Sequence, residues 1–549
     1  MFVRIKERNH GKKSVQIVEN YRSGSKIRQK IIRHIGQAVS EKELRVLRSL
    51  AQWVIVEARN KKQPVFSLFK PEDVYGRRNK KPTKDKVEID QLREEHRIIE
   101  GIGEIFGKIY SDLGFDDLIG GTKKDSQWNG ILKSCVIARI SNPESKRKTA
   151  DLLEEDYAIR IPLEKIYRMM DHAGEREDLI KKRVGETTKS LFKEKVDVLF
   201  FDVTTLYFES IETDDLKKFG FSKDCKFKET QIVFALVTTS KGLPVTYEIF
   251  PGNMYEGHTL ITIVNNLKQK HDIERVVLVA DRAMFNDENL KLMESERIDY
   301  IVAARLKSLN TKLKTQIIED ADFKANVVND EFYWSKEFKY NDRRLIVSYN
   351  VRRARKDAAD RARLVERLLK KSKDNKIKLK DLIPNYGSKK FVTVNNQTVT
   401  VNDEKIDAEA KWDGFHGVIT NVKEDSVVKI LSRYAGLWQI EEAFRVSKHD
   451  LKFRPIYHWT PQRIKSHILI CFLAFTLVKQ VLYRVKMKNI DMSFDKIRNE
   501  LLHVQSSLMV DIKTQKRYLI PSHVTTNQNR IYQAVGLDRS DVPCSIENE

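Results

Sequence analysis

Two aspartates lie at positions where a sheet could hold them for phosphoryl-transfer chemistry. Asp202 lies inside the segment 196–208, which is apolar on both faces and therefore predicts a central strand. A carboxylate in such a strand is costly unless it is paired or bound to a metal. Asp281 directly follows the strand-like segment 275–280, and ligand sites in open α/β sheets lie at the carboxyl ends of strands. The ordinary alternatives are a buried ion pair or a solvated strand end for Asp202 and a helix cap for Asp281.

A third acid, Glu441, lies in the segment 434–448, whose pattern predicts one helix. Every third or fourth residue is apolar, which predicts a stripe that packs against a sheet: Leu437, Ile440, Phe444 and Leu451. Glu441 borders this stripe, whereas Glu442 is rotated by about 100° toward solvent. We therefore expect Glu441 to be the functional acid. The ordinary alternative is a surface ion pair between Glu441 and Arg445.

The order of the predicted elements indicates how the two aspartates meet. A strand at 196–208 is followed by a hairpin at 231–250, and then helices alternate with strands at 275–280 and 300–304. Three antiparallel strands followed twice by a helix and a strand is the order of an RNase H-like α/β core. In that fold the first and fourth strands are neighbours, which brings Asp202 and Asp281 together.

The whole chain is predicted to be a multidomain α/β protein. Its RNase H-like mixed sheet is interrupted by a β-rich insertion and preceded by a β-hairpin module and a helical domain. The length of 549 residues agrees with about three to four domains. The expected divisions are a basic hairpin and helix module with a linker (1–95), a helical DNA-binding domain (96–192), the catalytic core (193–305 and 425–480), the insertion (306–424) and a C-terminal helical and tail region (481–549).

The charge of the chain indicates a polyanionic partner. Lys and Arg number 101 against 78 Asp and Glu, a net charge of +23. Segments 1–50 and 351–380 each hold 13 basic and 4 acidic residues. Nucleic acid is the first expectation and an anionic membrane the second, with a solvated basic surface as the ordinary alternative.

The cysteines and apolar runs indicate the cellular compartment in which the protein acts. The four cysteines are far apart with no C-x-x-C pair, which excludes zinc ribbons and a disulfide framework. The N-terminus has no apolar run typical of a signal peptide. The longest apolar run, 468–478, is shorter than the roughly 20 residues of a spanning helix. We therefore expect a cytoplasmic protein that binds nucleic acid and no membrane.

The residues around the third acid match a family signature. Tyr434, Glu441 and Lys448 have the spacing Y-x2-R-x3-E-x6-K, although Leu437 stands at the arginine position. Segments 201–204 and 280–282 fit the first and second catalytic blocks of the same family, and the segments 251–253, 454–458 and 463–469 also fit it. Over roughly 100–480 the chain resembles the DDE transposases of bacterial and archaeal insertion sequences.

The resemblance implies an activity and a metal cofactor. Two Mg²⁺ ions would be held by carboxylates, with Asp202 bridging both and Asp281 and Glu441 binding one each, and Mn²⁺ would substitute. Water would free a 3′-OH at each end of the element, and that 3′-OH would attack target DNA. The implied partners are double-stranded DNA, as terminal inverted repeats and target, and a second copy of the chain, because two ends are cut in concert.

Further DNA contacts are expected around this site. By resemblance, Tyr434 and Lys448 contact the DNA backbone, and Arg445 could replace the arginine missing at Leu437. Arg282 follows the second acid directly and is a further candidate. An aromatic residue of the insertion could stack on a flipped base, namely Trp412, Phe415 or His416. The alternative is that these rings are strand-core aromatics, and the basic helix 352–371 is either a DNA-backbone contact or a solvated face.

Two other classes of protein remain open. A non-catalytic DNA-binding relative, such as a domesticated transposase, would explain the charge but not an aspartate within a buried strand. Another RNase H-like nuclease would explain the acids but not the spacing from Tyr434 to Lys448 or the long insertion.

Overall fold

The computed structural model describes most of the chain. The described residues are 2–7, 13–23, 26–38, 44, 47–48, 51, 85–192, 198–220, 228–254, 259–260, 262–263, 266, 277–281, 286–320, 322–328, 331–373, 390–395 and 398–546. They form two compact units, one of Met1–Lys70 with Ala158–Arg160 and one of Pro71–Tyr157 with Ile161–Glu549. Each unit is described by itself.

The first unit contains a three-stranded antiparallel sheet at the N-terminus. Its strands are β1 (Phe2–Glu7), β2 (Lys13–Ser23) and β3 (Lys26–Ala38), in the order β1-β2-β3. Val15 and Ile17 are fully buried against Ala51, so one face of β2 forms the core of this unit. The three expected strands are therefore present, whereas most of the helix expected from residue 40 lies outside the described residues.

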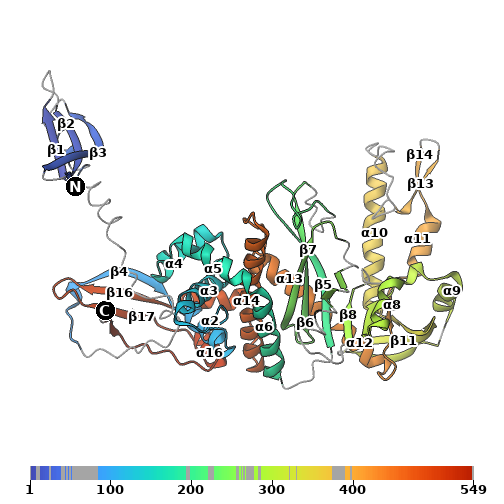
Figure 1. Cartoon of the computed structure of the whole chain (residues 1–549). Coiled ribbons are helices and arrows are strands. Elements are labelled where there is room, and N and C mark those ends of the chain that lie inside the picture. Colours follow the sequence, from blue (N-terminus) through green and yellow to red (C-terminus); the bar gives the residue numbers. More distant parts are fainter. Residues whose placement is uncertain are drawn as a thin grey trace. The chain divides into compact units, whose positions relative to one another are not determined.

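The second unit is built on a nine-stranded mixed sheet, whose order is β10-β11-β12-β15-β9-β8-β5-β6-β7. The first three core strands along the chain are antiparallel neighbours: β5 (Val198–Tyr207), β6 (Gln231–Thr239) and β7 (Pro244–Pro251). The next two, β8 (Val277–Ala280) and β9 (Asp299–Ala303), lie on the other side of β5 and run parallel to it. The arrangement confirms the RNase H-like α/β core (Figure 1).

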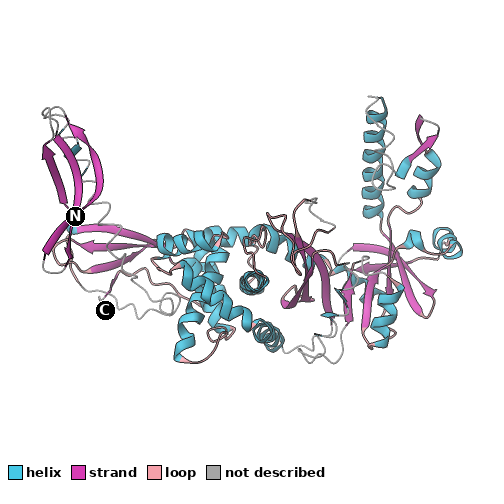
Figure 2. Cartoon of the chain, turned by 45° about the horizontal axis from the view of Figure 1, so that its top comes forward, coloured by secondary structure: helices cyan, strands magenta, loops and turns pink. Residues whose placement is uncertain are grey.

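The insertion extends this sheet. Four of its strands continue the sheet beyond β9, with β15 paired antiparallel to β9: β10 (Lys324–Val328), β11 (Glu331–Tyr340), β12 (Arg343–Tyr349) and β15 (Phe415–Thr420). The rest of the insertion stands away from the sheet, where helix α10 lies beside the hairpin β13–β14 (Figures 1 and 2): α10 (Val351–Lys373), β13 (Val392–Asn395), β14 (Thr398–Val401) and α11 (Asp403–Ala410). The insertion is thus continuous with the core, not separate from it.

Different helices cover the two faces of the core strands. On one face, Leu199, Phe201 and Val203 of β5 belong to an apolar cluster with α8 (Asp287–Ser295) and α9 (Thr311–Glu319). On the other face lie α13 (Trp438–Arg445) and α14 (Pro461–Met487). There the ring of Phe234 lies 6.3 Å from that of Phe444, and Tyr247 lies 4.8 Å from Phe472.

Helix α14 also forms the centre of the helical domain. Four helices of this domain pack against α14: α2 (Gly101–Asp112), α3 (Lys123–Ser141), α5 (Leu163–Glu175) and α6 (Glu177–Phe192). Helix α4 (Lys146–Tyr157) packs against α3 and α5. Among the described helices, α14 alone has the length and apolarity to cross a membrane, but 83% of its most apolar window is buried inside the protein. Its apolar run, longer than expected, therefore belongs to the protein core.

The C-terminal region is a folded part of the second unit. Its strand β16 (Gln505–Asp511) pairs antiparallel with β4 (Leu92–Ile99), and β17 (Arg517–Pro521) and β18 (Cys544–Ile546) complete the sheet. Two helices accompany them, α15 (Phe494–Leu502) and α16 (Thr526–Ala534). Residues 481–549 are therefore more than a helical tail, and residues 92–99 form a strand where the sequence suggested the end of a linker.

Candidate active site

The strand register places Asp202 beside Asp281. Phe201 of β5 is the partner of Ala280 in the parallel strand β8, and each aspartate is the next residue. Phe201 and Ala280 both lie in the apolar cluster on one face of the sheet. Because side chains alternate along a strand, the two aspartates point to the other face, under α13. Asp202 is half-buried and Asp281 is exposed, so both carboxylates are reachable from solvent.

The segment carrying Glu441 is three short helices, and the expectation of a single helix was wrong. Helix α12 (Val427–Ala435) ends at Gly436, α13 follows, and a π-helical turn covers Val446–Asp450. The break occurs where the chain is pressed against the sheet, since a Cβ at Gly436 would lie 2.6 Å from Cζ of Phe200. Phe200 lies on the same face of β5 as Asp202. The glycine thus brings α13 close to the two aspartates.

Replacing Gly436 with Ala is expected to destabilise the protein. Its backbone is in the right-handed helical region (φ −68°), so the cost is steric and comes from the Phe200 ring. We expect a loss of about 1–3 kcal/mol in the free energy of unfolding, measured by denaturant titration. The matched control is Gly121→Ala, where nothing lies within 4 Å of the added carbon. Equal effects at the two glycines would contradict this account of the helix break.

The two neighbouring glutamates of α13 have different surroundings. Glu441 is exposed and borders the stripe formed by Ile440 and Phe444, which is buried on the sheet as expected. Glu442 is partly buried, contrary to the expectation that it faces solvent: 32% of its side chain is exposed, and its Oε2 lies 3.6 Å from Nζ of Lys479. That lysine belongs to α14 and only 7% of its side chain is exposed, so burial lowers its pKa while Glu442 opposes the shift. Lys479 directly follows the apolar run 468–478, which marks it as a candidate buried charge but does not identify its partner.

The carboxylates of Asp202, Asp281 and Glu441 are suitable ligands for a divalent metal, but the structure brings only the two aspartates together. Adjacent carboxylates are the hard oxygen ligands that Mg²⁺ and Mn²⁺ bind. Oδ1 of Asp202 accepts a hydrogen bond from the backbone N–H of Val203 at 2.7 Å, which orients this carboxylate. Among the residues that the structure describes, no three His, Cys, Asp or Glu side chains lie close enough to hold an ion. Glu441 is therefore near this face without joining Asp202 and Asp281.

The aromatic candidates lie in or beside the core of the sheet. The rings of Tyr434 and His416 are stacked at a tilt, with centroids 4.9 Å apart. Trp412 packs edge-on against Phe415, and both contact the apolar cluster. These contacts agree with the alternative of core aromatics for Trp412.

The basic candidates differ in how firmly they are held. Arg445 is about half exposed, and its guanidinium lies 3.3 Å from Asp450 and 3.9 Å from Glu442. Lys448 is half-buried in the π-helical turn. Arg282 lies outside the described residues.

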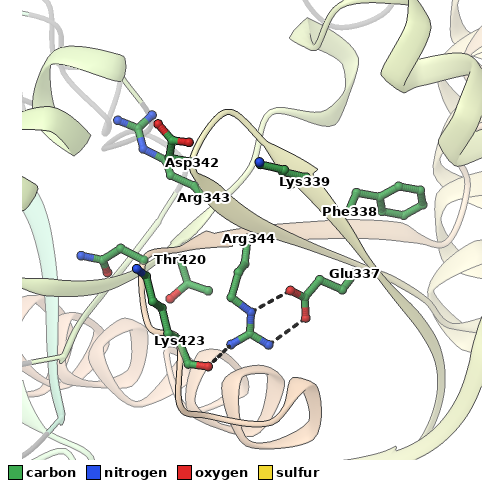
Figure 3. Close-up of a pocket in the computed structure, with 9 residues that line it drawn as sticks. Glu337, Phe338, Lys339, Asp342, Arg343, Arg344, Thr420 and Lys423 are labelled. Atoms are coloured by element: carbon green, nitrogen blue, oxygen red, sulfur yellow. Dashed lines mark hydrogen bonds and ion pairs between the residues drawn. The ribbon is translucent and has the colours of Figure 1, made fainter.

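A network of hydrogen bonds fixes the approach to α12. Arg344 of β12 donates two hydrogen bonds to the carboxylate of Glu337, at 2.7 and 2.8 Å. Figure 3 shows these two bonds and the bond from the third guanidinium nitrogen to the carbonyl of Lys423, at 3.4 Å. The same nitrogen also donates to the carbonyls of Val422 and Asp425, both at 2.8 Å. Asp425 in turn pairs with Arg433 of α12. The insertion sheet thereby holds the helix that carries Tyr434.

Two family models together match most of the chain. A family model described as transposase DDE domain matches residues 194–477. A second, described as the N-terminal domain of IS1634 family transposases, matches residues 2–59. The comparison with proteins of assigned function finds no match.

Solved structures give only weak likenesses. A piggyBac transposase synaptic complex with hairpin DNA is 10% identical, with a TM-score of 0.36, covering 73% of this chain and 77% of that chain. A Mos1 transposase paired-end complex with the left transposon end is 12% identical, with a TM-score of 0.15, covering 31% of this chain and 57% of that chain. A Mos1 mariner paired-end complex with Mn is 11% identical, with a TM-score of 0.14, covering the same shares. Likenesses of this strength carry no argument about function.

Proposed function

The chain belongs to the DDE transposases of insertion sequences, and we propose that it cuts both ends of its DNA element and joins the freed 3′-OH ends to target DNA at a site formed by Asp202, Asp281 and Glu441. The observation that carries the assignment of the site is the register that sets Asp202 beside Asp281 on the face under α13. The paired-acid arrangement suits phosphodiester chemistry, which needs charge stabilisation at the attacking and leaving oxygens.

Each acid has its own part in this proposal. Divalent ions, Mg²⁺ with Mn²⁺ as a substitute, would supply an activated water and charge stabilisation of the phosphate when bound. Asp202, oriented by the Val203 N–H, would hold both ions, and Asp281 and Glu441 one each. Three carboxylates repel one another in the absence of cations. Glu441 is therefore proposed to approach the two aspartates only when ions and DNA are present.

The basic residues around the site are proposed to hold DNA. The carboxylates of the site repel phosphate, so attraction must come from elsewhere on a chain of net charge +23. Tyr434, Lys448 and Arg445 follow or flank Glu441 and are proposed to contact the backbone of double-stranded DNA. On α10, Arg355, Lys356 and Arg367 are exposed on a helix that stands away from the sheet, which supports a second DNA contact. Concerted cutting of two ends favours a homodimer on DNA, acting in the cytoplasm.

Metal removal is the first test of this function. The substrate is DNA carrying the inverted repeats that flank the gene, with a supercoiled plasmid as target. We expect cleavage and joining to disappear with EDTA and to return with Mg²⁺ or Mn²⁺, because the carboxylates cannot bind or activate the phosphate alone. Gel analysis of labelled ends measures both steps. Activity in EDTA would contradict the proposal, and cleavage without joining would indicate another RNase H-like nuclease.

A further inference from the structure

A second, basic cavity lies away from the three acids. Its volume is about 260 Å³, and it lies between α3, the start of α4 and the segment that follows the π-helical turn. Its lining includes four cationic side chains and two imidazoles, which are Arg139, Lys146, Lys452, Arg454, His458 and His467. The family signature assigns no role to this cavity.

Lys146 is the least compensated charge in the cavity. The residue is 4% exposed, and no carboxylate among the described residues pairs with it. Burial, followed by the neighbouring Arg139 guanidinium, lowers the pKa of Lys146 to about 8. The other groups nearby are the thiols of Cys135 and Cys471, whose pKa values burial raises, so they are neutral at pH 7. A buried ammonium without a counter-ion is costly, which indicates a missing anion.

The acids that line the cavity do not supply this anion. Glu144 pairs through Oε1 with Nζ of Lys452 at 3.2 Å, and its backbone carbonyl accepts a hydrogen bond from Arg139 at 2.8 Å. Glu209 is exposed at the edge. Both carboxylates therefore lie apart from Lys146, which leaves its ammonium uncompensated.

The two histidines add polar groups without adding charge. Burial, with Lys146 and Arg139 nearby, lowers the pKa of His458 to about 3, so its ring is neutral. His467 is 4% exposed, and its Nε2 lies 3.2 Å from the carbonyl oxygen of Phe453, to which it donates. Its Nδ1 is buried and has no hydrogen-bond partner among the described residues. Because Nε2 carries the single proton of the neutral ring, Nδ1 is a hydrogen-bond acceptor and does not bind an anion, so the positive groups of the cavity are Lys146, Arg139 and their cationic neighbours.

The start of α4 contributes in the same direction. Lys146 is the first residue of this twelve-residue helix, and the hydroxyl of Ser145 accepts a hydrogen bond from the N–H of Lys148 at 3.3 Å. The N-terminal end of a helix carries partial positive charge and favours anions. The dipole therefore adds to the cationic side chains around the cavity.

We propose that this cavity binds one phosphate group of the DNA backbone, with Lys146 and Arg139 as its charge partners. The choice of DNA as the source of the phosphate rests on the proposed function. The cavity is joined to the strand that carries Asp202: the N–H of Ile456 donates to the carbonyl of Tyr207 at 3.4 Å, and the Arg454 guanidinium lies over the Tyr207 ring at 5.4 Å. Five residues of strand separate Asp202 from Tyr207, about 17 Å at roughly 3.3 Å per residue. A phosphate held in the cavity beside Tyr207 would therefore lie about five base pairs of duplex from the bond cleaved at Asp202.

Lys146→Met tests the site, with Lys146→Gln as a second variant. We expect DNA affinity to fall by about tenfold or more, and the slope of log K against log salt to fall by about 0.9. We also expect the thermal midpoint to rise, because an uncompensated buried charge is removed. The control is Lys148→Met on the same helix, where the exposed lysine pairs with Glu155 at 3.5 Å and little change is expected. Unchanged DNA affinity and salt slope in both Lys146 variants would overturn the proposal.

Neutral methylphosphonates placed singly along the element end locate the contact. We expect wild type to lose affinity at a phosphate about five base pairs from the cleaved bond, and Lys146→Met to be insensitive there. Equal losses in both proteins at every position would overturn the proposal. The proposal would also be overturned if inorganic phosphate stabilised the wild-type protein while DNA bound equally well to wild type and to the Lys146 variants. Cleavage by wild type is scored separately: Lys146-dependent binding without cleavage would contradict the proposed function and leave the phosphate site standing.

Discussion

Asp202→Asn is expected to abolish both cleavage and joining of DNA ends, lowering the single-turnover rate by about a thousandfold or more. The carboxylate is proposed to serve two metal ions, and losing several kcal/mol of charge stabilisation costs a factor of ten per 1.4 kcal/mol or so. Asp281→Asn is expected to act in the same way. DNA affinity should be kept or increased, because a carboxylate that repels phosphate is removed.

The protein should remain folded in both variants. Asp202 is half-buried next to Asp281, so the substitution relieves repulsion between two carboxylates, and the thermal midpoint should not fall. Asp407→Asn is the matched control, since this aspartate is exposed on α11, which is not one of the strands that carry the proposed site. If Asp202→Asn keeps more than about a tenth of the wild-type rate, the metal-binding role of Asp202 is wrong.

The core strands could be predicted because their signals are local. The segment 196–208 is apolar on both faces, and β5 is indeed hydrogen-bonded on both sides, by β6 and β8. The pairing of β4 with β16 could not be predicted in this way, because the partners are about 400 residues apart and neither strand is strongly apolar. The pairing of β15 with β9, which makes the insertion part of the core sheet, also joins distant segments, such as Val418 with Ala303, so local patterns do not reveal it.

The candidate site was predictable to the extent that it lies on strands. Side-chain alternation and the ends of strands located Asp202 and Asp281, and the register places them together. Helical periodicity could not reveal the break at Gly436, because the cause is the ring of Phe200 on a distant strand. It also could not reveal the partner of Glu442, because Lys479 lies on a different helix, α14. Contacts that depend on tertiary packing leave little trace in local spacing.

Glu441→Gln and Glu442→Gln are expected to fail in opposite ways. Glu441 is exposed beside the sheet-facing stripe, so its substitution should lower the cleavage rate by about a thousandfold with little effect on unfolding. Glu442 pairs with Lys479, so its substitution should keep most of the activity and lower the free energy of unfolding by about 1–2 kcal/mol, a value reduced for partial exposure. A dead Glu442 variant with a live Glu441 variant would reverse the assignment.

The pH dependence of unfolding separates the structural role of Glu442 from a catalytic one. Burial already lowers the pKa of Lys479 in the folded protein, and loss of Glu442, which raises it, should lower it further. Between the folded and unfolded pKa values the unfolded state binds more protons, so stability rises with pH there. The deficit of Glu442→Gln should therefore shrink as the pH rises toward the unfolded pKa of lysine, as measured by denaturant titration at several pH values. Lys479→Met in the same background should remove the pH dependence, because the uncompensated ammonium is then absent.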